Sequence, residues 1–179
     1  MSFVCRSSRQ PSYRIRQRGA SLLEGIAYLG IAAIVILGAV SLLTNAFGSA
    51  QANRTTEEVL SIRTAVRKLY MGQAGYGTTS LNTTLVTAHA LPSGLSQTGS
   101  TITNSFGGAV TVTGANTAFT ITYAALPQDV CINSVSGANG WNQIDAAGSN
   151  AITTFPAAPA DAAKVCAVNG ANTITFTSN

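Results

Sequence analysis

Glu24 has the most unusual chemical setting in the sequence, because its carboxylate stands at the head of a long apolar segment. Residues 26–43 read IAYLGIAAIVILGAVSLL, and no charged residue follows Glu24 before Arg54. A charged side chain costs about 2.5–3.5 kcal/mol at the centre of a membrane-inserted helix and less near an end. A helix that begins at Ala20 places Glu24 in its first turns, where the macrodipole favours an anion.

Something must compensate for this carboxylate, and if the chain is cut after Gly19, a free amino group appears at Ala20. Glu24 can then pair with the Ala20 amine of its own subunit or of a neighbouring one, which neutralises both charges inside a water-free helix bundle. The alternative is an interfacial Glu24 that extends to the lipid headgroups.

The segment that must hold Glu24 is long enough to span a bilayer. The uncharged residues 25–53 form roughly 44 Å of helix at 1.5 Å per residue, against a hydrocarbon core of about 30 Å. Positive residues usually stay on the cytoplasmic side, and the preceding segment is rich in arginine. Its basic residues are Arg6, Arg9, Arg14, Arg16 and Arg18.

The charge of the whole chain reflects this leader. The formal net charge is +4, but the residues from Ala20 onward hold five basic and six acidic side chains. A basic face for nucleic-acid binding is therefore not expected.

A second interpretation of the N-terminal region is a secretory signal peptide cut after Ala52, because Ala50-Gln51-Ala52 has the small-x-small pattern. Its apolar core is longer than usual and opens with Glu24.

Three cysteines are present, and Cys5 lies in the leader. Cys131 and Cys166 remain, which is the count expected of one disulfide formed in an oxidising compartment. Two unpaired buried thiols are the alternative.

The run Arg18-Gly19-Ala20-Ser21-Leu22-Leu23-Glu24 resembles the processing site of type IV prepilins. The resemblance implies that a membrane-embedded prepilin peptidase cuts between Gly19 and Ala20, that Ala20 is N-methylated, and that Glu24 guides assembly. The long leader is similar to those of type IVb pilins, including conjugative thin pili and enteric adhesive pili. The Cys131 and Cys166 pair resembles the disulfide that closes the C-terminal region of pilins. Ala20 departs from the phenylalanine of the best-known pilins.

The same resemblance implies partners and location. They are a homopolymer, minor pilins, the prepilin peptidase and an assembly machinery with an inner-membrane platform, an ATPase and an outer-membrane secretin. The precursor is expected in the inner membrane of a Gram-negative bacterium with a cytoplasmic N-terminus, and the assembled subunit in an extracellular pilus. A pseudopilin of a secretion system is the related alternative.

The expected fold is α+β and pilin-like, a long N-terminal helix packed on a C-terminal antiparallel sheet. Residues 1–19 form the leader, 20–47 the transmembrane and filament-core helix, and 48–179 the globular domain. Within that domain, residues 48–72 continue the helix as an amphipathic stretch that Gly72 ends, and 73–99 form a loop with at most one short helical turn. Residues 100–179 form the sheet and the disulfide-bonded region.

Alternating side chains predict about four strands. AVTVTG and AFTITYAAL form one hairpin around Gly114-Ala115-Asn116, and KVCAV and ANTITFT form another around Asn169-Gly170. Cys166 then joins a strand to the segment around Cys131.

Little in the chain suggests catalysis. The only histidine is His89, and the carboxylates after Glu24 show no spacing suited to acid/base work. No nucleotide, metal or nucleophile motif is present, so neither an enzyme nor a cofactor is expected. Asn53 and Asn82 match the glycosylation sequon, but no sugar is predicted. Trp141 is expected in the core or at a subunit contact, and an exposed adhesive role is the alternative.

Overall fold

The computed structural model describes residues 21–146 and 149–179. The chain divides into two units, residues 1–42 and 43–179. Helix α1 (Leu22–Leu69) contributes to both. Arg67 and Lys68 occupy its last turn, where cations favour the negative end of the macrodipole. Gly72 adopts a positive φ of 85° just beyond it, so the helix ends where the glycine was expected to end it.

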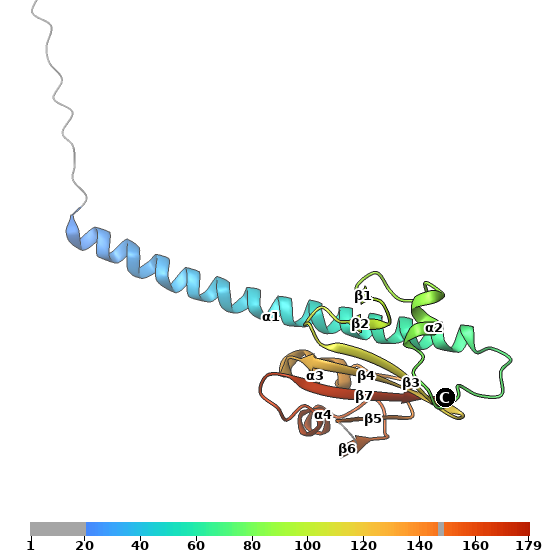
Figure 1. Cartoon of the computed structure of the whole chain (residues 1–179). Coiled ribbons are helices and arrows are strands. Elements are labelled where there is room, and N and C mark those ends of the chain that lie inside the picture. Colours follow the sequence, from blue (N-terminus) through green and yellow to red (C-terminus); the bar gives the residue numbers. More distant parts are fainter. Residues whose placement is uncertain (1–20, 147–148) are drawn as a thin grey trace, which may run out of the picture. The chain divides into compact units, whose positions relative to one another are not determined.

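In the second unit, α1 is amphipathic. Thr55, Val59, Ile62 and Val66 are buried along one side, and their spacing of three and four places them on a single face. The C-terminal half of α1 runs along the sheet (Figure 1), and Val59, Ile62 and Val66 share one core cluster with the buried residues of the strands. The predicted packing of an amphipathic helix on an antiparallel sheet is confirmed.

Within residues 21–146 and 149–179, the sheet has seven antiparallel strands in the order β1-β2-β3-β4-β7-β5-β6. The strands are β1 (Ser96–Thr98), β2 (Thr101–Thr103), β3 (Ala109–Ala115), β4 (Ala118–Leu126), β5 (Gln143–Ala146), β6 (Ser149–Ile152) and β7 (Asn172–Ser178). Strand β7 lies between β4 and β5, so the last strand of the chain joins two parts of the sheet.

The inward face of the central strands forms the core. Phe119, Ile121 and Tyr123 alternate along β4, and Ile174 and Phe176 alternate along β7, all of them buried. Ile121 is paired with Phe176 and Tyr123 with Ile174, so large side chains meet across the two strands. Full burial of such a side chain contributes about 1.5–3 kcal/mol, which makes this pair of strands a main source of stability.

The first predicted hairpin is confirmed and the second is wrong. Strands β3 and β4 pair across a turn at Asn116 and Thr117, whereas Gly114 and Ala115 of the predicted turn are the last residues of β3. KVCAV, in contrast, ends helix α4 (Pro159–Val165) and continues into a loop. Pro159 at the start, Asp161 in the first turn and Lys164 in the last turn all favour a helix there. Asn169-Gly170 is consequently in a loop that leads to β7.

The structure has five further elements that the sequence did not predict individually. Helix α2 (Asn82–Thr87) and strand β1 lie in the segment 73–99 that was expected to be mainly loop. Helix α3 (Gln128–Ser136) and strands β5 and β6 occupy the region between the cysteines. Cys131 on α3 and Cys166 at the end of α4 form the disulfide, with a Cα–Cα distance of 5.9 Å. The bond therefore joins two helices, and the expectation that Cys166 lies on a strand is wrong.

Candidate assembly site on the N-terminal helix

The structure describes Glu24 but not the predicted processing site. Gly19 and Ala20, with the whole leader, lie outside the described residues, so cleavage, methylation and the Ala20–Glu24 pairing stay predictions. Glu24 is in the first turn of α1, where its charge was expected to meet the positive end of the helix dipole.

A tyrosine one turn further along is the hydrogen-bond partner of Glu24. The hydroxyl of Tyr28 donates to Glu24 Oε1 across 3.3 Å, an i to i+4 contact on the helix surface. Tyr28 is also the only residue between Gly25 and Val40 whose side chain can form a hydrogen bond. The sequence prediction did not include this contact, although the i to i+4 spacing of Glu24 and Tyr28 is visible in the sequence.

The first unit leaves its apolar side chains uncovered. Large side chains from Leu22 to Leu42 are more than half exposed on every side of α1, and Leu22 and Leu23 are 83% and 80% exposed. The helix is long and apolar enough to cross a membrane, by length and composition alone. An apolar surface of this extent needs lipid or other apolar helices around it, so this segment is suited both to membrane insertion and to helix bundling.

A buried carboxylate fixes the globular part of α1 to the sheet. Glu58 Oε1 accepts a hydrogen bond from Arg54 Nε at 3.1 Å, and Glu58 Oε2 accepts one from the Tyr123 hydroxyl at 3.4 Å. Burial of the phenol, followed by the charge and hydrogen bond of Glu58, raises the pKa of Tyr123 well above its ordinary value of 10.0. Arg54 also donates to the carbonyl of Gly94 at 3.3 Å, which ties the segment before β1 to the helix.

Trp141 belongs to the core. It is 6% exposed, its ring centroid lies 5.1 Å from that of Phe176, and the Arg63 guanidinium carbon lies 4.8 Å from its ring centroid. Desolvation of Arg63 and the charge of Arg67 lower the pKa of Arg63. The expectation of a core tryptophan is confirmed, and the adhesive alternative is not supported.

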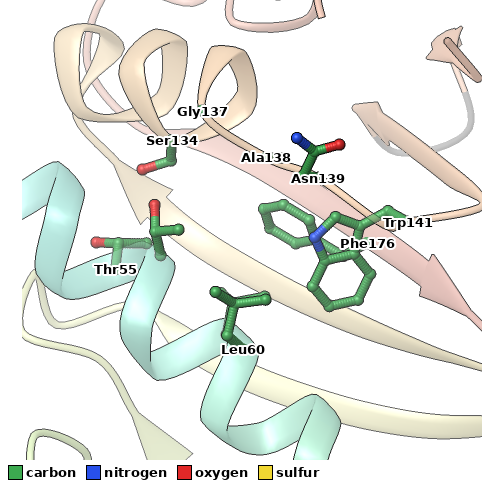
Figure 2. A pocket seen from close by; sticks show the side chains of 10 residues that line it. Thr55, Leu60, Ser134, Gly137, Ala138, Asn139, Trp141 and Phe176 are labelled. Carbon is green, nitrogen blue, oxygen red and sulfur yellow. The ribbon is translucent and has the colours of Figure 1, made fainter. Parts of the chain in front are cut away.

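A small cavity lies between α1, α3 and the two aromatic rings (Figure 2). Its volume is about 80 Å³, well below the roughly 300–1,000 Å³ of a typical ligand site. The hydroxyls of Thr55 and Ser134 at its wall both donate to backbone carbonyls, at 3.0 and 3.4 Å. This cavity is accordingly a packing void. The described residues also hold no cluster of three or more histidine, cysteine or acidic side chains that could bind a metal.

Asn82, one of the two sequon residues, has a structural role that was not predicted from the sequence. Its amide nitrogen donates to the carbonyl of Val110 at 3.0 Å, and its amide oxygen accepts from the nitrogen of Val112 at 2.8 Å. The side chain is buried and fixes α2 to β3.

The arrangement of a long apolar-to-amphipathic helix on an antiparallel sheet defines the class of protein as a type IV pilin. A crystal structure of TcpA, a type IV pilin from Vibrio cholerae El Tor, matches the fold with a TM-score of 0.56 and 16% sequence identity. The match covers 73% of this chain and 99% of that one.

The chain belongs to the PilS family, since residues 49–179 match the model described as PilS N terminal. It is also 32% identical over 173 residues to the major structural subunit of the bundle-forming pilus of Escherichia coli O127:H6. It is 31% identical to the corresponding subunit of Escherichia coli O111:H-. Each of these two alignments covers 91% of this chain and 89% of the relative.

Proposed function

We propose that this chain is the major structural subunit of a type IVb pilus and polymerises into a surface filament. The observation that most directly supports this function is the uncovered apolar helix that begins near Glu24 and is joined to a globular domain with its own core. Two relatives that align along most of their length are major structural subunits of a pilus.

Processing creates the assembly-competent subunit in this proposal. Subunits wait in the inner membrane with the arginine-rich leader in the cytoplasm, and the prepilin peptidase removes residues 1–19. The new Ala20 amine, methylated or not, then meets a Glu24 carboxylate in the dry centre of the filament. Burial of the apolar helices against one another supplies the cohesion. The inner-membrane platform, ATPase, secretin and minor pilins are the partners that this route requires.

The N-terminus of the assembled subunit tests this proposal. Mass spectrometry of sheared surface filaments should show a chain that begins at Ala20, with a methyl group if the amine is modified. Gly19→Asp should leave the leader in place, whereas Glu24→Ala should allow cleavage but prevent filament formation. Normal filaments from either variant, or a terminus elsewhere in the chain, would contradict the proposal.

The two alternatives give different results in the same measurement. A soluble protein released by signal peptidase begins at Asn53, but Ala52 is buried within the continuous α1 and its carbonyl accepts a hydrogen bond from Ser134. A pseudopilin of a secretion system begins at Ala20 as well and is distinguished by the absence of long surface filaments.

A further inference from the structure

The outward face of the globular half of α1 carries two opposite charges at its ends. Glu57 and Lys68 are both exposed, and neither forms an ion pair within the described residues. Eleven residues correspond to about three turns at 3.6 residues per turn. The two side chains therefore project from the same side of α1, about 16 Å apart along the axis at 1.5 Å per residue.

The residues between these charges leave room for a close neighbour. Ser61 and Thr64 lie on the same face, and both are small and exposed. The Thr64 hydroxyl donates to the carbonyl of Leu60 at 2.9 Å, so its hydrogen-bonding capacity is partly used within the helix. The buried stripe of Val59, Ile62 and Val66 is on the opposite side of α1, against the sheet.

Two separate hollows lie beside this face. Ser61 lines both of them, one with Glu57 and the segment 92–94, and one with Lys68 and the segment 88–90. The hollow beside Glu57 has a volume of about 580 Å³ and is open to solvent. The hollow beside Glu57 is also lined by Arg54 and Glu58, which pair with each other. Charged residues make up only 9% of the chain, so the charges of Glu57 and Lys68 beside the two hollows, unpaired within the described residues, are a marked feature of this surface.

We propose that this face is a contact between copies of the chain, in which Glu57 of one subunit pairs with Lys68 of a neighbour. The inference rests on the proposed function, because subunits inserted in one membrane with the same topology present parallel helices. Parallel neighbours at equal height place like charges opposite each other, which is unfavourable. An axial displacement of eleven residues, about 16 Å, replaces both repulsions with a Glu57–Lys68 pair. The contact is heterologous and repeats from subunit to subunit.

Cysteine cross-linking within assembled filaments tests the contact directly. A chain with Glu57→Cys and Lys68→Cys should form a ladder of covalent multimers on mild oxidation, because each subunit contacts one neighbour through each cysteine. Either single substitution should give no ladder. The native Cys131–Cys166 pair is fully buried and should not exchange. A product that stops at dimers would indicate an antiparallel contact and overturn the proposal, as would the absence of cross-links in intact filaments.

Charge reversal supplies an independent measurement. Glu57→Lys and Lys68→Glu should each lower the yield of pili about fivefold. A change of this size is expected when one modest ion pair is replaced by a repulsion between like charges. The double reversal should restore the yield, although the two residues are too far apart to pair within one subunit. A double variant as poor as the single ones would overturn the contact.

Wild-type and Glu24→Ala strains run in parallel separate the two proposals. No filaments from the wild type, or normal ones from Glu24→Ala, would contradict the pilus function. Filaments that require Glu24 but give no Glu57–Lys68 cross-link would overturn the interface alone.

Discussion

The Tyr28 hydroxyl donates a hydrogen bond to the Glu24 carboxylate one helical turn away, at 3.3 Å. An isolated carboxylate is costly in an apolar medium, and each hydrogen bond to the charged form reduces that cost. Tyr28 occupies Oε1, so Oε2 is left to accept the amine of a processed subunit. The tyrosine is therefore a positioning residue in the assembly step that we propose.

Tyr28→Phe removes this hydrogen bond and retains the ring. We expect normal cleavage of the leader and a yield of pili lowered about tenfold, the scale of one hydrogen bond to a charged group. The measurement is the amount of sheared filament relative to processed subunit in the membrane. Tyr70→Phe is the matched control, because Tyr70 directly follows the end of α1 and its ring packs beside Tyr76 in the globular domain. Equal yields from Tyr28→Phe and the wild type would remove Tyr28 from the assembly step.

The disulfide between α3 and α4 should stabilise the domain strongly. Cys131 and Cys166 are fully buried and close a loop of 34 intervening residues, which contributes about 3–4 kcal/mol in the chain-entropy model. Replacing both cysteines with alanine should lower the free energy of unfolding by about that amount. Trp141 is the only tryptophan and is buried, so its fluorescence can follow denaturation of the detergent-solubilised protein. A change below 1 kcal/mol would contradict a major stabilising role.

The buried Tyr123 beside Glu58 predicts a loss of stability at high pH. The pKa of Tyr123 is raised in the folded protein, whereas the phenol of the unfolded chain titrates near 10.0. Below pH 10 both states are protonated, so the stabilisation is fully present there. Above pH 10 the unfolded state loses the proton first, and stability should fall by up to about 1.4 kcal/mol per pH unit.

Tyr123→Phe should weaken this alkaline dependence. Urea denaturation between pH 8 and 11 measures it, and Tyr28→Phe serves as a control that keeps the buried phenol. An equal slope in Tyr123→Phe and the wild type would show that other groups cause the alkaline loss.

Local patterns in the sequence were sufficient for the parts of the fold that depend on nearby residues. The apolar run after Glu24 and the spacing of Val59, Ile62 and Val66 indicated the two halves of α1, and alternation indicated β3 and β4. Residues 164–168 show where this fails. KVCAV has strand-forming residues, but Pro159 and Asp161 begin a helix upstream, and the disulfide to α3 fixes the end of that helix.

Long-range pairing explains most of what the sequence could not indicate. The position of β7 between β4 and β5 brings together strands that are separated by α3 and α4, and no local pattern specifies that order. In the candidate site, the Glu24 position was clear from the apolar run. Glu57 and Lys68 gained significance only once the structure showed which face of α1 is buried.

The two sequon residues give a matched pair for the role of Asn82. Its amide bonds to the backbone of both Val110 and Val112 are buried, whereas Asn53 is exposed. Asn82→Ala leaves a carbonyl and an amide without these partners, and each buried unsatisfied group costs about 1–3 kcal/mol. We expect a loss of about 2–4 kcal/mol in the free energy of unfolding for Asn82→Ala, and a change within about 0.5 kcal/mol for Asn53→Ala. Similar losses from both substitutions, measured by Trp141 fluorescence during denaturation, would show that the bridge from α2 to β3 is not what makes Asn82 important.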